Sequence, residues 1–149
     1  MNAPIKVALM CALLSACAST EAAKVAAPAP SAPTHCNAQQ LVFYFGSWET
    51  ALNDVAQKEI SLVQTKLAGC SIDAVRIVGM AGAPGDVAAN IEVSRKRAET
   101  VADALAAGGW PRDRFQLEVR GEDGATTSDG LEKPMRRRAE VSVTASTLK

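Results

Sequence analysis

The sequence predicts an α/β sandwich in which two helices pack on one face of a mixed sheet, in the order β-α-β-α-β-β. Four segments have the pattern of strands, since each is a short apolar run or alternates apolar and polar residues. Two longer segments between them repeat apolar residues at steps of three and four, as amphipathic helices do. Strands that alternate with helices in this way favour a layered α/β architecture.

The first half of the predicted domain contains a strand, a helix and a second strand. Residues 41–45 are an apolar run that Gly46 ends, and Ser47 is then a candidate N-cap for the helix. The apolar stripe of this helix consists of Leu52, Val55, Ala56, Ile60, Val63 and Leu67. Gly69 ends the helix, and residues 75–79 form the next strand.

The second half contains a longer helix and two more strands. Asp86 is a candidate cap for a helix that runs to about Ala107, with Ala98, Val101, Ala102 and Leu105 facing inward. Pro111 prevents that helix from resuming after two glycines. Residues 121–137 are predicted to be a loop with room for a short helical turn. The two strands alternate, and their inward residues are Phe115, Leu117 and Val119, then Ala139, Val141 and Val143.

Residues 1–16 have the pattern of an export signal. Lys6 supplies the positive charge, and residues 7–14 are an eight-residue apolar stretch that is too short to cross a membrane. The segment Leu14-Ser15-Ala16-Cys17 resembles the bacterial lipobox, which implies cleavage before Cys17 and acylation of that residue. Ala18 then indicates the outer membrane. The alternative is an ordinary secretory signal in which this cysteine has no role.

Residues 17–35 are predicted to be an acylated cysteine followed by a tether, and residues 36–149 a single domain. The segment after Cys17 is rich in alanine and proline, so it cannot bury enough apolar surface to fold. Cys36 precedes the first strand of the domain, and Cys70 follows the helix that runs back beside that strand. These two ends come together, so in an oxidising compartment we expect a Cys36–Cys70 disulfide. The alternative is two free thiols.

Composition and spacing argue against several classes of function. With 16 basic and 16 acidic side chains the formal net charge is +0, so no basic field attracts nucleic acid. The single histidine, His35, precedes the predicted domain, which excludes Ser/His/Asp catalysis within it. Glycines 79, 82 and 85 lack the spacing of a dinucleotide-binding loop. We therefore expect no enzymatic activity, no cofactor and no bound metal.

Residues 79–101 resemble the signature of the OmpA-like, peptidoglycan-associated domain. The positions that match are Gly79, Gly85, Asn90, Ser94, Arg97, Ala98 and Val101. Gly121 and Glu122 resemble a turn of the same family, and residues 137–141 resemble its closing strand. The resemblance covers nearly all of residues 36–144, and it implies the α/β fold of that family.

The resemblance also implies a binding site. The family's domain grips the diaminopimelate end of the peptidoglycan stem peptide as a zwitterion. Arg97 matches the arginine that binds the ligand's carboxylate, a pairing in which a planar guanidinium can donate two hydrogen bonds. Asn90 matches the asparagine that shapes the pocket. We expect the head group of Arg97 to face solvent or ligand, so that Arg97→Ala would leave the fold intact.

One departure from the family's pattern concerns the ligand's ammonium group. Gly82 stands where the family has the aspartate that pairs with this group, and Glu122 and Asp123 are candidate substitutes on another loop. Arg137 belongs to a set of basic residues that bias this surface towards an anionic ligand, the others being Arg95, Lys96, Arg97, Arg136 and Arg138. The alternative is that these charges form only a solvated face.

Together these patterns predict a lipoprotein on the periplasmic face of the outer membrane, whose domain binds peptidoglycan non-covalently and tethers the envelope. The expected partners are the diaminopimelate-containing stem peptide and, through acylated Cys17, the outer membrane. The alternative is a protein-interaction module of an envelope complex, in which stem-peptide binding is weakened or lost because of Gly82.

Overall fold

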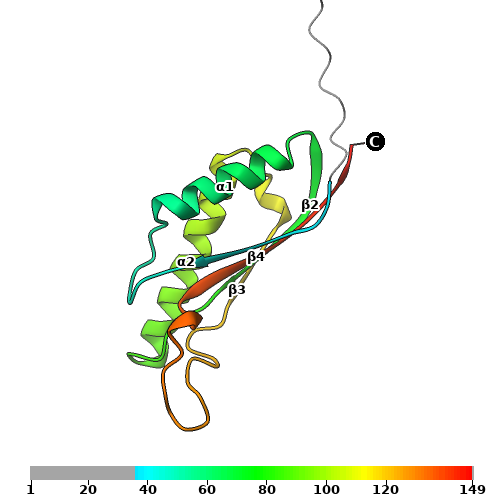
Figure 1. The fold of residues 1–149 in the computed structure, drawn as a ribbon. Helices are drawn as coiled ribbons and strands as arrows, with labels where there is room; N and C mark the ends of the chain where they lie inside the picture. The colour runs from blue at the N-terminus through cyan, green and yellow to red at the C-terminus, as the bar shows by residue number, and fades with distance from the viewer. Residues whose placement is uncertain (1–35, 149) are drawn as a thin grey trace, which may run out of the picture. The chain divides into compact units, whose positions relative to one another are not determined.

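A four-stranded mixed sheet with two helices on one of its faces makes up residues 36–148, the part of the chain that the computed structural model describes (Figure 1). The predicted α/β class and the order of the main elements are confirmed. The predicted signal peptide, the acylation site at Cys17 and the tether all lie outside the described residues.

The sheet has the strand order β1-β4-β2-β3. Strand β4 (Arg138–Thr147) lies between β1 (Gln39–Tyr44) and β2 (Cys70–Gly79) and is antiparallel to both. Strand β3 (Phe115–Val119) is parallel to β2 at the far edge. The last strand in sequence therefore joins the two halves of the domain, and its first residues lie beside the ends of β1 and β2.

Helix α1 (Asp54–Lys66) begins later than the sequence predicts. Asn53, not Ser47, is the N-cap, and its side chain accepts a hydrogen bond of 2.9 Å from the backbone N–H of Ala56. Residues 45–53 form a loop instead of a first helical turn. Val55 was expected in the apolar stripe, but it is 73% exposed because the helix that starts at Asp54 turns it to solvent.

Helix α2 (Val87–Ala107) matches its prediction closely. Asp86 is the N-cap and accepts a 2.9 Å hydrogen bond from the backbone N–H of Ala89. Gly108 is the C-cap. The inward face is buried as expected, through Ala98, Val101, Ala102 and Leu105. This face packs on the sheet beside α1 and forms one core with the inward residues of β1, β2 and β4.

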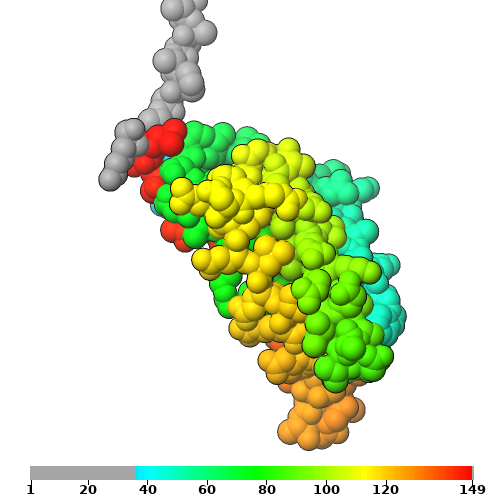
Figure 2. Space-filling model, turned by 180° about the vertical axis from the view of Figure 1, so that it is seen from behind, coloured from blue at the N-terminus to red at the C-terminus, as the bar shows by residue number. Residues whose placement is uncertain are grey.

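Two short 3-10 helices complete the described fold, η1 (Arg112–Arg114) and η2 (Pro134–Arg136). The second lies at the end of the segment predicted as a loop, which also contains a bridge between Thr126 and Glu132. Figure 2 shows this segment in orange, projecting from one end of the domain. A disulfide joins Cys36 to Cys70, as expected, with Cα atoms 5.7 Å apart. It ties the segment before β1 to the first residue of β2.

Candidate ligand-binding site

A small hollow lies at the end of the sheet where β1 and β2 finish and β4 begins. Its lining comes from the β1–α1 loop, the β2–α2 loop, α2 and the residue before β4, and consists of Ser47, Trp48, Ala81, Gly82, Pro84, Asn90, Val93, Arg97 and Arg137. The structure therefore brings together all four residues that the sequence singled out for ligand binding. The cavity volume is only about 10 Å³, so the surrounding side chains leave little free space in the hollow.

The close approach of α2 to β2 fixes one wall of this hollow. A Cβ atom built on Gly79 would lie 1.9 Å from the backbone oxygen of Ser94, so only glycine allows the helix to pack here. The Ser94 hydroxyl donates to the carbonyl of Ile91 at 2.9 Å and accepts from the N–H of Gly121 at 3.0 Å. Gly79 and Ser94 therefore support the site without lining it.

Asn90 is buried at the start of α2, where it is 2% exposed. Its side-chain amide donates a hydrogen bond to the carboxylate of Glu122, which comes from the loop after β3. Glu122 thus holds Asn90 in place. The other candidate substitute, Asp123, uses its backbone carbonyl to accept from Arg136. Neither carboxylate belongs to the described lining of the hollow.

Arg97 faces the interior, which contradicts the expectation that its head group meets solvent. The residue is 1% exposed. Its guanidinium donates from Nε to the carbonyl of Glu49 at 2.8 Å, from Nη1 to that of Met80 at 2.8 Å and from Nη2 to that of Gly46 at 2.9 Å. One side chain therefore joins α2 to the β1–α1 loop and to the end of β2.

The environment of Arg97 is electrostatically unusual. Burial, together with the positive charge of Arg137, lowers the pKa of Arg97 to about 10, while the carboxylate of Glu49 acts in the opposite direction. The guanidinium is still protonated at neutral pH. Its central carbon lies 5.0 Å from the centroid of the Phe45 ring, within the range of a cation–π contact.

Arg137 lies against Gly82 on the other side of the hollow. A Cβ atom built on Gly82 would be 3.1 Å from Cγ and 3.3 Å from Cδ of Arg137. Gly82 does not have a positive φ, so its backbone does not require glycine. Arg137 is half-buried, and its Nε is buried without a hydrogen-bond partner among the described residues.

Trp48 also lines the hollow, and the sequence patterns had not singled it out. Its backbone has a φ of 62°, and its ring lies so close to Gly85 that a Cβ there would be 2.4 Å from Cη2. The signal that could have identified Trp48 is its position, because it is one of two tryptophans and lies in the loop between the first strand and the first helix. Trp48 therefore adds an aromatic ring to a lining that also contains Arg97 and Arg137.

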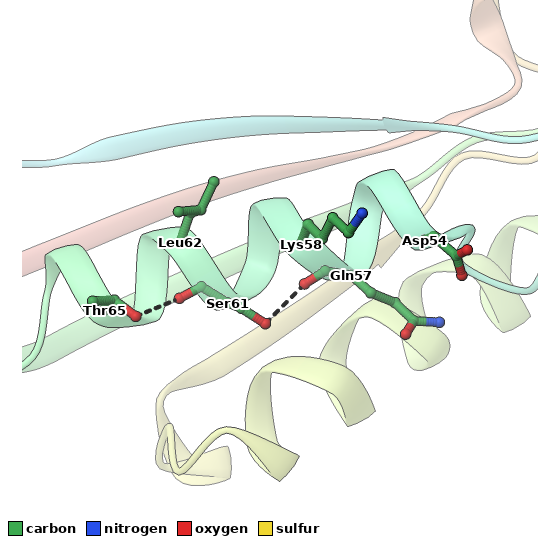
Figure 3. A pocket seen from close by; sticks show the side chains of 6 residues that line it. All are labelled: Asp54, Gln57, Lys58, Ser61, Leu62 and Thr65. Carbon is green, nitrogen blue, oxygen red and sulfur yellow. Dashed lines mark hydrogen bonds between the residues drawn. The ribbon is translucent and has the colours of Figure 1, made fainter.

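Another hollow lies on the surface of α1. Figure 3 shows this hollow of about 560 Å³ along the outer face of α1, whose described lining comes from this helix alone: Asp54, Gln57, Lys58, Ser61, Leu62 and Thr65. Ser61 and Thr65 there donate to carbonyls one turn earlier, at 3.0 and 2.8 Å, so these hydroxyls serve the helix itself. Within residues 36–148 no group of three or more His, Cys, Asp or Glu side chains could hold a metal. No helix in this part of the chain is long and apolar enough to span a membrane.

Comparison with known proteins identifies the family. The model of the OmpA family matches residues 43–139. The fold is similar to the OmpA-like domain of FopA1 from Francisella tularensis subsp. tularensis SCHU S4, with a TM-score of 0.60, 24% identity and 75% of each chain covered. It is also similar to the peptidoglycan-associated lipoprotein from Burkholderia pseudomallei (TM-score 0.54, 17% identity, 70% of this chain and 89% of that one). The cell wall anchor of the T6SS from Pseudomonas aeruginosa gives a TM-score of 0.57 at 20% identity, over 78% and 87% of the two chains. A search of the curated proteins finds no match.

Proposed function

Because the chain belongs to the OmpA family, we propose that it is an outer-membrane lipoprotein whose periplasmic domain binds peptidoglycan non-covalently. In this proposal acylated Cys17 anchors the protein in the outer membrane, and residues 17–35 span the distance between that membrane and the peptidoglycan layer. Residues 36–149 bind the diaminopimelate-containing stem peptide. The protein tethers the two layers of the envelope. The family is one of structural proteins rather than enzymes, which confirms the expectation that this chain is not an enzyme.

The observation that carries this proposal is the convergence of Asn90, Arg97 and Arg137 on one hollow at the end of the sheet. Guanidinium groups match the carboxylates of a stem peptide in shape and charge. Two similar folds also belong to proteins whose names refer to peptidoglycan and to the cell wall, which supports a ligand of this kind.

A second candidate function is an interaction module of an envelope complex with little affinity for peptidoglycan. The small size of the hollow favours it, because a cavity of about 10 Å³ has no room for a diaminopimelate side chain. The glycine at position 82 favours it as well, since it cannot pair with an ammonium group. The two candidates differ in one measurable property, which is binding to sacculi.

Sedimentation with purified sacculi tests the proposal. We expect the full-length protein to co-sediment with diaminopimelate-containing sacculi, and Arg137→Glu to reduce the bound fraction about tenfold or more, because it repels a ligand carboxylate. Arg112→Glu is the matched control, since Arg112 is exposed, outside the hollow and paired with Asp103. Sacculi that fail to retain the wild-type protein would favour the interaction module.

Mass spectrometry of the mature N-terminus tests the membrane anchor. The lipobox-like segment before Cys17 leads us to expect a chain that starts at Cys17 and carries acyl chains. The Cys17→Ser variant should lack this modification and leave the membrane fraction. A mature chain that retains residues before position 17 would contradict the anchor without bearing on peptidoglycan binding.

A further inference from the structure

We propose that this site recognises a carboxylate that has no free ammonium group beside it, and that Arg137 is the side chain that binds it. The inference rests on the proposed function and names the chemistry of the ligand at the same site. A diaminopimelate residue fits this description when its amine has been converted to an amide, as in a cross-link between two stem peptides.

The charge of the lining is the first argument. The described residues around the hollow include two arginines and no aspartate or glutamate. Two carboxylates that contact the lining or its loops are already hydrogen-bonded, since Glu49 accepts from the backbone N–H of Gly46 at 3.1 Å and Glu122 accepts from Asn90. An incoming ammonium group would find no carboxylate in the described lining and would be repelled by both guanidinium groups. A carboxylate alone would be attracted.

The contact between Gly82 and Arg137 is the second argument. The family's pattern places an aspartate at position 82, and here the space beside that backbone is taken by the aliphatic stem of Arg137. A built Cβ would be 3.1 Å from that stem, which is tighter than ordinary contact. The position has therefore lost a negative side chain next to a positively charged residue that matches the family's closing strand. This loss changes which charge the site prefers, and weaker binding is not the only consequence.

The hydrogen-bond inventory of the two arginines is the third argument. Arg97 has five N–H groups and gives three of them to backbone carbonyls. Its role is to position the loops around the hollow. Arg137 instead has a buried Nε without a partner among residues 36–148. A ligand carboxylate that forms a bidentate ion pair with Arg137 would accept a hydrogen bond from that Nε.

Trp48 should respond to a bound ligand, because it lines a hollow whose volume is only about 10 Å³. Its ring lies against Gly85, and its left-handed backbone conformation is uncommon for a bulky residue. Binding should therefore change the fluorescence of Trp48. The second tryptophan, Trp110, is buried away from this lining and contributes a constant background. Trp48→Phe should remove the change and so identifies its source.

Three peptides test which charged group of the ligand the site recognises. The first is L-Ala-γ-D-Glu-meso-diaminopimelate, the second carries an acetylated amine on the outer carbon of diaminopimelate, and the third carries an amidated carboxylate on the same carbon. We expect the full-length wild-type protein to bind the acetylated peptide at least as tightly as the first, and the amidated peptide about tenfold or more weakly. Calorimetry and Trp48 fluorescence both report this order.

Variants at positions 137 and 82 test which residues determine the preference for a carboxylate without an adjacent ammonium group. Arg137→Ala should lose about tenfold or more in affinity for the acetylated peptide. Arg137→Lys should retain only part of the wild-type affinity, because lysine keeps the positive charge but lacks the planar guanidinium that donates two hydrogen bonds to a carboxylate. Gly82→Asp should bind the unmodified peptide more tightly than the acetylated one. Arg112→Ala is the control for an exposed arginine outside the site, and thermal unfolding checks that each variant is folded.

The outcomes distinguish this inference from the proposed function. If wild type binds the unmodified peptide and loses affinity on acetylation, the inference is wrong and peptidoglycan binding stands. If wild type binds sacculi but Arg137→Ala retains full affinity, the assignment to Arg137 is wrong. If neither sacculi nor any peptide binds, the proposed function fails together with the inference that rests on it.

Discussion

Replacing Arg97 with alanine is expected to lower the free energy of unfolding by about 3–5 kcal/mol. The buried guanidinium donates to the carbonyls of Gly46, Glu49 and Met80, which lie on two separate loops. Alanine would leave these carbonyls without their donor and would open a cavity under Phe45. The expected result is a less stable protein in which the β1–α1 loop is no longer fixed to α2.

Chemical denaturation monitored by circular dichroism measures this effect. Arg97→Lys should be intermediate, because one ammonium group cannot reach three carbonyls in the geometry of the guanidinium. Arg95→Ala is the matched control on the same helix, since Arg95 is exposed and pairs only with Glu92 on the helix surface. If Arg97→Ala unfolds at the wild-type denaturant concentration but no longer binds sacculi, Arg97 is a ligand-binding residue and not a structural one.

Removing the disulfide between Cys36 and Cys70 is expected to lower the free energy of unfolding by about 3–4 kcal/mol. The two cysteines are 34 residues apart in sequence, so the bond closes a long loop that contains β1 and α1. In the chain-entropy account, this closure restricts the unfolded chain more than the folded one. The strand and helix should remain folded but unfold more readily.

Denaturant unfolding curves recorded with and without a reducing agent measure the free energy of unfolding that the disulfide contributes. The double variant Cys36→Ser/Cys70→Ser should match the reduced wild type and should not respond to the reducing agent. Peptide mapping under non-reducing conditions should recover Cys36 linked to Cys70. Identical curves for oxidised and reduced wild type would contradict the expected stabilisation.

Local signals predicted the parts of the fold that depend on nearby residues. Asp86 starts α2 as expected because a capping side chain acts on the first turn of its own helix. The alternation of apolar and polar residues that predicts β4 is likewise a property of neighbouring residues. Ser47 was the predicted cap for α1, but the structure uses Asn53, and local sequence did not reveal this difference. The engagement of Gly46 and Glu49 by Arg97 holds residues 46–49 out of the helix, and this contact spans about fifty residues of chain.

The sequence predicted which residues meet at the candidate site, but the predicted orientation of Arg97 was wrong. Gly82, Asn90, Arg97 and Arg137 do meet at one hollow. The direction of Arg97 could not be read from α2, because a helical position only assigns a face and the partners of that face come from other segments. Trp48 was missed for the same reason, since its ring acquires a role only where Gly85 lies beneath it.

By itself the sequence determined the class of the fold, the elements, the cysteine pair and the motif positions that identify the family. These depend on residue periodicity, capping and spacing, which act over a few neighbouring residues. Only the tertiary structure decided that Arg97 is buried and donates from each of its three nitrogens to a backbone carbonyl, that Arg137 fills the space beside Gly82 and that Trp48 lines the hollow. Each of these depends on contacts between segments far apart in the chain, and burial and hydrogen-bond satisfaction are set only when those segments pack together.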